Sequence, residues 1–364
     1  MANHLVILMQ EIPLPIVTRS RMRWVVLVSL SAFVCACSRT PMVYQRQLLA
    51  MGTLVDVSID GVSAHKAQAG VEAVAQQMHL VGHRWHAWKP SRLTRINRAL
   101  EAGRAVSLTP RESRVIREAM TVARRSDYLF DPAIGKLVAL WGFHTDVRPK
   151  LPPPPPAAIQ ALVQQHPSMA DLTLKQDILR TSNRAVQLDF GGFAKGLAIN
   201  RSIAALKQLG INNAIVNAGG DMRVIGNKDG HPWRIGIKNP RAEGVIAAVD
   251  MQGDESIYTS GDYERFFIYH GKRYCHIIDP RTGMPAPGVT SVTVIHQNAA
   301  IAEAADKALF IAGPAGFARM AARLGVSQAM LIDTHGTVYM TPAMARRVHF
   351  EIQPAPKTEI VKLP

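Results

Sequence analysis

The sequence predicts an α+β fold of mixed sheets flanked by helices. Apolar residues at helical spacing mark four segments, whereas short alternating runs typical of strands dominate the chain after residue 213. Strict strand–helix–strand repeats, which would build a doubly wound parallel sheet, are few. The 364 residues are 48% hydrophobic and 19% charged, which is enough to bury one large core or two smaller ones.

The amino end has the proportions of a secretion signal. The apolar run Trp24–Ala36 is too short to span a bilayer. It follows three arginines, Arg19, Arg21 and Arg23. It closes in the sequence VCAC, which resembles a lipobox, with a small residue before the cleaved bond and Cys37 as the thiol that receives a diacylglycerol. We expect residues 1–37 to be a lipoprotein signal and lipobox, and the protein to be anchored through Cys37 on the periplasmic side of a bacterial membrane.

Two alternatives concern this amino end. The segment could be a signal peptide that merely contains cysteines. A start at Met22 would leave a compact lipoprotein signal. After acylation of Cys37, Cys275 would be the one free thiol, so we expect neither a disulfide framework nor a CxxC zinc pair.

The net charge narrows the range of partners. The formal charge is +15, but it is scattered along the chain and is not interleaved with aromatic residues as a nucleic-acid-binding stripe requires. We interpret it as suited to anionic phosphates or to a membrane surface, with no nucleic acid as a partner.

Local patterns predict the first elements. Residues Tyr44–Asp60 partly alternate in polarity around Met51-Gly52-Thr53, which predicts a strand broken by a tight turn. Apolar residues on one face predict a helix over Ala64–Val81. A second helix should begin at Thr109, which is followed by a first-turn proline and a capping-box glutamate, and should end near Ser126.

The middle of the chain contains a spacer and another helix. Five consecutive prolines within Leu151–Pro156 predict an extended surface segment. We interpret it as an insertion within one catalytic domain spanning residues 38–350, and a domain boundary there is the alternative. A helix is expected over Phe193–Leu209 and should be stopped by Gly210.

Strands dominate the last part of the chain, with a hairpin turn at His270-Gly271. The expected strands are Ala214–Asn217, Trp233–Ile237, Ala247–Met251, Arg265–Tyr269, Arg273–Ile278, Ser291–His296 and Gln328–Asp333. A helix from about Ala300 to Ile311 and a turn at His335-Gly336 complete the domain. Residues 351–364 are expected to be a loose tail.

A glycine-rich turn is the first candidate binding site. The sequence DFGGFAKG, Asp189–Gly196, lies where a strand ends and a helix begins. Glycines there expose backbone N–H groups to a phosphate, and Lys195 adds a positive charge. The segment therefore predicts an anion site, with a plain structural turn as the alternative. It matches neither the P-loop nor the GxGxxG fingerprint.

Three further turns carry polar side chains. Asn217–Asp221 ends in a carboxylate that could accept a ribose or adenine donor, and the hydroxyls of the turn Tyr258–Tyr263 could bind phosphate oxygens. For both segments a structural turn is the alternative. The sequence HIIDPRTG, His276–Gly283, delivers an imidazole from a strand into a turn that carries both signs of charge. A histidine in this position suits proton transfer at neutral pH.

Taken together and in order, these segments resemble the FAD:protein FMN transferase (ApbE-like) family, also labelled thiamine biosynthesis lipoproteins. The resemblance covers nearly the whole chain after the signal. Its segments are Met51–Thr53, Ser91–Asn97, Phe130–Pro132, Leu140–Phe143, Asp189–Gly196, Asn217–Asp221, Trp233–Pro240, Ser260–Arg265 and His276–Gly283.

The resemblance implies an α+β fold with T-fold-like sheets and a cleft that binds FAD. It implies cleavage of the FAD pyrophosphate and transfer of FMN to a Ser or Thr of an extracytoplasmic acceptor protein, or to water. It makes His276 the candidate base and Ala194 a carbonyl ligand of Mg²⁺. The residues that it assigns to FAD binding are Met51, Gly52, Thr53, Asp189, Gly191, Gly192, Lys195, Gly219, Gly220, Asp221, Ser260, Asp262, Asp279 and Thr282.

One pair of residues departs from the family pattern. Members usually carry an Asp and, four residues on, a Thr as Mg²⁺ ligands before an Ala-Leu-Phe sequence, and alignment on Ala308–Phe310 puts Glu303 and Lys307 there. A glutamate could still bind the ion, but an ammonium group has no free lone pair. Asp306 could take over as a ligand, Lys307 could replace the metal electrostatically, or the site could bind without chemistry. A structural Glu303–Lys307 ion pair is a further interpretation.

Other functions are also compatible with these motifs. The protein could be a lipid-anchored flavin-binding protein without transferase activity, or an FAD pyrophosphatase that releases AMP and FMN. His79 and His83 at positions i and i+4, together with His86, could hold Zn²⁺ or Cu²⁺, or could be exposed histidines without a ligand.

Replacement of Cys37 tests the predicted anchor. Cys37→Ser is expected to move the protein from the membrane fraction to a soluble or unprocessed form, because a mature lipoprotein is held by several acyl chains and this variant cannot receive them. Cys275→Ser is the matched control and should leave the distribution unchanged. Cell fractionation with a salt wash makes the measurement, and a Cys37→Ser protein that still sediments with membranes contradicts the lipoprotein interpretation.

Overall fold

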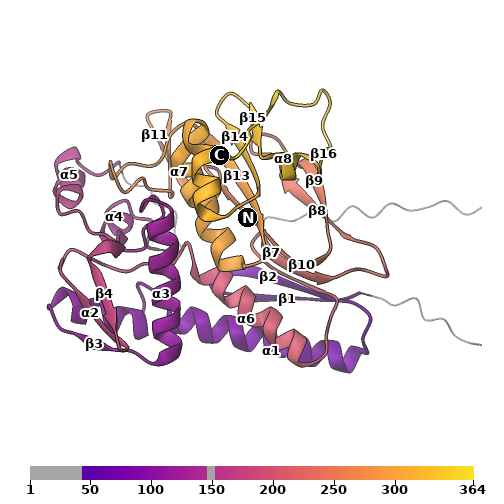
Figure 1. Cartoon of the computed structure of the whole chain (residues 1–364), viewed down its shortest axis with the longest axis horizontal. Helices are drawn as coiled ribbons and strands as arrows, with labels where there is room; N and C mark the ends of the chain where they lie inside the picture. The colour runs from indigo at the N-terminus through magenta and orange to yellow at the C-terminus, as the bar shows by residue number, and fades with distance from the viewer. Residues whose placement is uncertain (1–42, 146–151) are drawn as a thin grey trace, which may run out of the picture.

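A nine-stranded sheet lies at the centre of the computed structural model, which describes residues 43–145 and 152–364 (Figure 1). The predicted signal and Cys37 lie outside the described residues. Neighbouring strands are antiparallel except for the last pair, β15 and β17. In sheet order the strands are β1 (Tyr44–Ala50), β2 (Thr53–Ile59), β6 (Ala214–Ala218), β7 (Asp221–Gly226), β10 (Gly253–Gly261), β13 (Val289–His296), β14 (Gln328–Asp333), β15 (Val338–Met340) and β17 (Thr358–Ile360).

Each face of this sheet buries a separate apolar core. Successive residues of a strand point to opposite faces, so Tyr258 of β10 packs in the core under the long helices while Ile257 packs in the other. The helices that cover the first face are α1 (Ala64–Arg84), α6 (Ala194–Gln208) and α7 (Ala299–Leu324). The second face is covered by a small sheet and a short helix, namely β8 (Trp233–Lys238), β9 (Val245–Met251), β16 (Val348–Phe350) and α8 (Pro342–Ala345).

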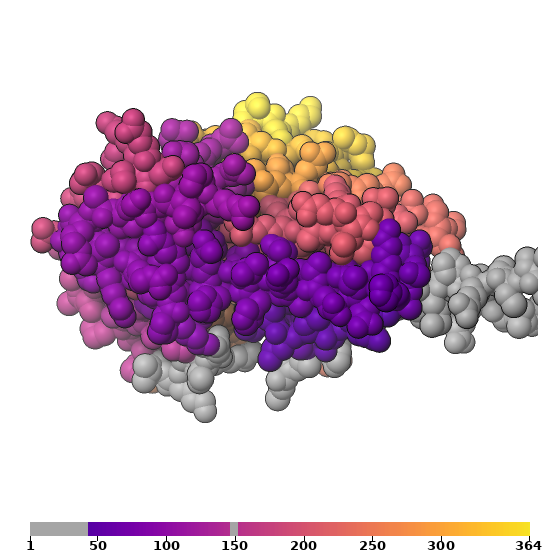
Figure 2. All heavy atoms as spheres, turned by 90° about the horizontal axis from the view of Figure 1, so that it is seen from below, coloured from indigo at the N-terminus to yellow at the C-terminus, as the bar shows by residue number. Residues whose placement is uncertain are grey.

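The remaining elements gather on one side of the sheet, at the left of Figure 1. They comprise α2 (Arg92–Glu101), α3 (Pro110–Arg125), α4 (Gly135–Leu140), α5 (Pro156–Gln164), the 3₁₀ turn Met169–Asp171, a small sheet of β3 (Val106–Ser107), β4 (Leu172–Lys175) and β5 (Ile178–Thr181), and the hairpin β11 (Phe266–Tyr269) and β12 (Lys272–Cys275). In the view of Figure 2 the amino-terminal part of the chain, from indigo to purple, covers much of one face of the molecule.

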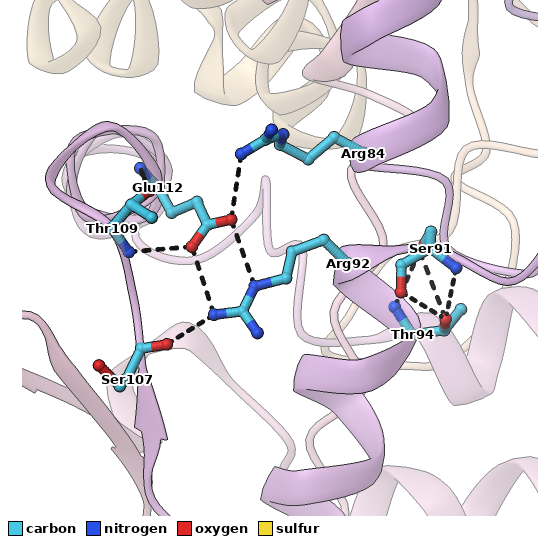
Figure 3. Close-up of polar contacts among 7 residues, drawn as sticks. All are labelled: Arg84, Ser91, Arg92, Thr94, Ser107, Thr109 and Glu112. Carbon is cyan, nitrogen blue, oxygen red and sulfur yellow. Dashed lines mark hydrogen bonds and ion pairs between the residues drawn. The ribbon is translucent and has the colours of Figure 1, made fainter.

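A buried glutamate joins α1, α2 and α3 (Figure 3). Glu112 accepts from the backbone N–H of Thr109 at 3.0 Å, which completes the capping box at the start of α3. Its carboxylate also accepts from Arg84 at 3.3 Å and from Arg92 at 3.2 Å. These contacts lower the pKa of Glu112 against the opposing effect of burial. Because Arg84 ends α1 and Arg92 begins α2, one carboxylate fixes the angle between three helices.

The structure confirms the predicted α+β class and most predicted elements. The strand break at Met51-Gly52-Thr53, the capping box at Thr109 and the hairpin turn at His270-Gly271 all lie where the sequence placed them. The helix expected over Phe193–Leu209 is α6, and Gly210 follows it in a left-handed conformation. Pro156 is the first residue of α5, a position that proline tolerates.

Three predictions are corrected. Residues 351–364 are not a loose tail, because β17 pairs in parallel with β15. Tyr258–Gly261 is the end of strand β10, so the predicted turn begins only after it. The helix expected to end at Ile311 continues to Leu324, with a kink at Gly313, whose φ of 64° interrupts the helical backbone. Among the described residues, no helix is long and apolar enough to cross a membrane.

The fold brings α6 and α7 into close contact at Gly196. A Cβ atom at this position would lie 2.5 Å from the carbonyl oxygen of Ala299 and 2.6 Å from the Cα of Ala300. Backbone atoms cannot move aside as a flexible side chain can. Only glycine therefore allows the first turns of the two helices to approach this closely.

Gly196→Ala is expected to lower the free energy of unfolding by about 1–3 kcal/mol, the usual effect of overpacking a core. The matched control is Gly82→Ala in α1, where the new Cβ would lie 3.0 Å from Cγ of the flexible Met51 side chain. The control should be neutral or stabilising by up to about 1 kcal/mol, because alanine is the better helix former. Urea unfolding makes both measurements, and equal effects of the two substitutions would contradict the proposed contact.

Candidate functional site

The glycine-rich turn before α6 is held by Asn97 of α2 and by Trp88 of the loop between α1 and α2. Asn97 of α2 donates to the carbonyl oxygen of Leu188 and accepts from its N–H, both at 2.9 Å. Trp88 donates through Nε1 to Oδ2 of Asp189 at 3.1 Å, and Gly191 N–H donates to Oδ1 at 2.8 Å. Burial raises the pKa of Asp189, and these hydrogen bonds oppose the shift. The Asp189 carboxylate therefore shapes the turn from within.

Helix α6 receives its amino-terminal cap from another helix. Phe193, the N-cap residue, offers no side-chain hydrogen bond. Oε2 of Glu303, on α7, accepts instead from the N–H of Gly196 at 2.7 Å. A carboxylate at this end of a helix satisfies an unpaired N–H and interacts favourably with the helix dipole.

Two lysines and three carboxylates surround this contact and form what we call the lysine–carboxylate cluster: Lys195, Asp221, Glu303, Asp306 and Lys307. Lys195 pairs with Oδ2 of Asp221 at the start of β7. Lys307 donates to Oδ1 of Asp306 at 3.1 Å and to the backbone carbonyl of Glu303 at 2.9 Å. Glu303 and Asp306 are fully buried. The cluster therefore joins α6, β7 and α7.

Burial and neighbouring charges shift the pKa values of the cluster residues. Burial raises the pKa of Glu303 to about 7, against the attraction of Lys307 and Lys195. Burial likewise raises the pKa of Asp306 to about 6, although Lys307 opposes the shift. Burial would lower the pKa of Lys195, but the carboxylates, Asp221 foremost, raise it above its ordinary value. The raised pKa values of Glu303 and Asp306 reduce the negative charge that the two lysines face near neutral pH.

The imidazole of His276 lies within electrostatic reach of this cluster. His276 follows β12, and its backbone N–H donates to the carbonyl of Arg265 at 2.9 Å. Nδ1 lies 3.3 Å from the same oxygen. Desolvation lowers the pKa of His276 to about 3, and the positive charges of Arg265, Lys307 and Lys195 contribute in that order. The ring is therefore neutral at physiological pH.

An aromatic core supports the hairpin that carries His276. Phe267 of β11 stacks on Tyr274 of β12 with ring centroids 5.2 Å apart, and Tyr274 stacks on Trp141 at 5.6 Å. Trp141 donates through Nε1 to the carbonyl of Gly283 at 2.7 Å. This contact ties both ends of the segment that begins at His276 to one rigid core.

Some predicted FAD-binding residues lie together at the turns of β1–β2 and β6–β7. Thr53 contacts Gly219 so closely that no Cβ fits there. The N–H of Gly220 donates to Oδ1 of Asn217 at 2.8 Å, and the space where a Gly220 side chain would project is open. Met51 and Gly52, in the turn before Thr53, both have positive φ. The chain beside Asp221 is thus shaped for close approach of a ligand.

The other predicted residues divide into two groups. The hydroxyl of Ser260 lowers the pKa of Asp306 and so belongs with the cluster. Asp262 makes a bidentate ion pair with Arg241, with both distances 2.7 Å. Both oxygens of the Asp262 carboxylate are therefore already bound by Arg241.

The turn after His276 also uses its polar side chains locally. Asp279 accepts from the guanidinium of Arg281 at 2.7 and 2.9 Å. The Thr282 hydroxyl accepts from the N–H of Met284 at 3.2 Å. In this structure both side chains shape the turn that follows His276. They make no direct contact with the lysine–carboxylate cluster.

The residues assigned to Mg²⁺ do not present a matching ligand set. Ala194 is the buried first residue of α6. Of the two carboxylates on α7, Glu303 uses Oε2 as a helix cap and Asp306 uses Oδ1 to accept from Lys307. The other oxygens, Oε1 of Glu303 and Oδ2 of Asp306, are buried without a hydrogen-bond partner, but the position of the hydroxyl ligand in the family pattern holds the ammonium of Lys307. Within residues 43–145 and 152–364, no group of three or more His, Cys, Asp or Glu side chains could hold a metal ion.

The three histidines of the alternative metal site do not form a ligand set among the described residues. His79 and His83 are exposed on α1. His86 accepts through Nδ1 from the backbone N–H groups of Trp88, at 3.1 Å, and Lys89, at 3.0 Å. Its ring therefore holds the loop after α1.

Fold and site together define a class, an α+β protein with a glycine-rich turn before a helix, a buried lysine–carboxylate cluster and a neutral histidine. The chain belongs to the ApbE family, whose model matches residues 51–331. An FAD:protein FMN transferase of Rhodobacter capsulatus is 41% identical over 306 residues, which cover 82% of this chain and 57% of that protein. One of Haemophilus influenzae is 28% identical over 79% of this chain and 86% of its own length.

Solved structures of the family have the same fold. The ApbE protein of Thermotoga maritima superposes with a TM-score of 0.77 at 30% identity, covering 86% of this chain and all of that one. The apo form of the flavinyl transferase ApbE of Pseudomonas stutzeri gives 0.74 at 27% identity, covering 84% and 97%. The resemblance seen in the sequence motifs is thus confirmed.

The low pKa of His276 predicts a pH dependence of stability. A histidine that is neutral in the folded state, with a pKa of about 3 against 6.5 when unfolded, stabilises the fold above pH 6.5, and this stabilisation is lost as the pH falls below 6.5. Between pH 7 and 5 the wild type should lose up to about 2 kcal/mol more unfolding free energy than His276→Asn. Urea unfolding at pH 7, 6 and 5 checks this, and parallel profiles would contradict the assigned environment.

Proposed function

We propose that this chain is an FAD:protein FMN transferase, which moves the FMN half of FAD onto a Ser or Thr hydroxyl of an acceptor protein. The observation that carries the proposal is the packing of the Lys307 side chain against Gly192, which brings an ammonium group to the glycine-rich turn within electrostatic reach of the neutral His276. A neutral imidazole near ammonium groups suits attack on a phosphoanhydride. The names of the relatives support the same reaction.

In the proposed reaction the acceptor hydroxyl oxygen attacks the phosphorus of the FMN half. The bond from that phosphorus to the bridging oxygen breaks, and AMP leaves with the electron pair. The proton of the hydroxyl passes to His276. The cations neutralise charge that develops on the phosphate oxygens.

Two other functions are the alternatives to the transferase. Water in place of the hydroxyl would make the protein an FAD pyrophosphatase, and absence of turnover would leave a flavin-binding protein. The transferase is favoured because the relatives at 41% and 28% identity are named FAD:protein FMN transferases.

The cellular setting is also part of the proposal. We place the protein on the periplasmic side of a bacterial membrane, anchored through Cys37, because the VCAC sequence follows a short apolar run. The acceptor would then be extracytoplasmic. Magnesium bound near Ala194, Glu303 and Asp306 is one way to neutralise the substrate, and the two lysines are another.

His276→Ala is expected to lower the rate of FMN transfer by about 10²- to 10⁴-fold, the usual contribution of a positioned acid–base group, while FAD affinity stays within about threefold. His79→Ala, which removes an exposed histidine of α1, is the control and should behave as the wild type. Transfer is followed by covalent flavin on the acceptor and affinity by calorimetry. An unchanged transfer rate in His276→Ala removes this residue from the mechanism.

A further inference from the structure

We propose that Lys307 contacts the FAD pyrophosphate directly and, together with Lys195, neutralises it in place of a divalent cation. The inference rests on the proposed function, since it assigns a role within the same site. It makes Lys307 a substrate-binding residue rather than a structural member of an ion pair.

The first argument is the position of the side chain. Lys307 extends from α7 across the glycine-rich turn, so that a Cβ atom at Gly192 would lie 2.7 Å from its Cδ and 2.9 Å from its Cε. Gly192 therefore leaves room for the methylene chain and holds it against the predicted anion turn. The side chain of Lys307 is 17% exposed and that of Lys195 28%, so an incoming ligand can reach both.

The second argument is the number of donors. An ammonium group has three N–H donors. In the described part of the chain, Lys307 uses one on the Glu303 carbonyl and one on Asp306, and Lys195 bonds Asp221. Each lysine keeps donor capacity for another acceptor. Phosphate oxygens are strong acceptors for such charge-assisted hydrogen bonds.

The third argument concerns charge. A divalent ion at Glu303 and Asp306 would lie within a few ångströms of the Lys307 ammonium, which is hydrogen bonded to both residues. Two positive centres that close repel each other at any plausible interior dielectric. Gly196 N–H and Lys307 already occupy Oε2 of Glu303 and Oδ1 of Asp306, which leaves Oε1 and Oδ2 as the carboxylate oxygens without a hydrogen-bond partner. The ammonium group supplies the positive charge at this position.

The test is calorimetric titration of FAD into the detergent-solubilised full chain, once with Mg²⁺ and once with EDTA. The wild type should bind FAD with affinities that agree within about threefold under the two conditions. Lys307→Met keeps the packing on Gly192 but loses the charge, and should weaken binding in EDTA by about 10- to 100-fold, as expected for a lost charge-assisted hydrogen bond. Lys307→Arg should retain most of the affinity.

A double variant, Lys307→Thr with Glu303→Asp, should bind FAD tightly only when Mg²⁺ is present, because it replaces the ammonium by a hydroxyl ligand. Lys136→Met, which removes a lysine paired with Glu101 at 3.1 Å, is the matched control and should leave binding unchanged. Urea unfolding verifies that each variant folds. If loss of its Lys307 partner leaves the buried Asp306 destabilising, the double variant Lys307→Met with Asp306→Asn replaces the single variant in the titration.

The outcomes separate this inference from the proposed function. A wild type that binds FAD only with Mg²⁺, or a Lys307→Met protein with unchanged affinity in EDTA, overturns the role of Lys307 even if FMN transfer proceeds. Tight binding in EDTA that is lost in Lys307→Met supports the role. If FMN transfer were then absent under both conditions, the transferase proposal would fail while the lysine assignment stands.

Discussion

The contact between the first turns of α6 and α7 is the constraint on which the site depends. Gly196 allows the two helices to touch through their backbones, and Glu303 spans the contact to cap α6. Because α6 has no side-chain cap of its own, it needs this carboxylate from α7. The same approach places Lys195 of α6 and Lys307 of α7 on either side of a buried acidic group. A structural requirement for helix capping thus also creates the electrostatics of the site.

This cluster is an unfavourable arrangement for stability alone. Three carboxylates face two ammonium groups in a largely buried place, and burial raises the pKa of Glu303 and Asp306. Buried ion pairs of this kind often stabilise a protein less than apolar side chains of the same volume would. Titratable groups with shifted pKa values that lie together beside a glycine-rich turn are typical of functional sites. The surrounding cores, and the Glu112 network that fixes α1, α2 and α3, supply the rigidity that holds the charges in place.

Local signals made much of the fold predictable, and non-local contacts explain what was missed. The Thr109 capping box and the His270-Gly271 hairpin depend on neighbouring residues and were predicted correctly. The pairing of β17 with β15 could not be predicted, because exposed edge residues such as Thr358–Ile360 have no apolar pattern. In the site, the motifs predicted the glycine turns and His276. The roles of Trp88 and Asn97 depend on partners 101 and 91 residues away, so their spacing carried no signal.

The proposed reaction cleaves FAD and transfers its FMN half to a protein hydroxyl. The direct test is mass spectrometry of tryptic peptides from periplasmic proteins incubated with FAD and this chain, with AMP measured in the same samples. We expect one FMN on a Ser or Thr of an acceptor peptide for each AMP released. Release of AMP with free FMN and no modified peptide would indicate a pyrophosphatase, and intact FAD would indicate a binding protein. Either result would contradict the transferase proposal.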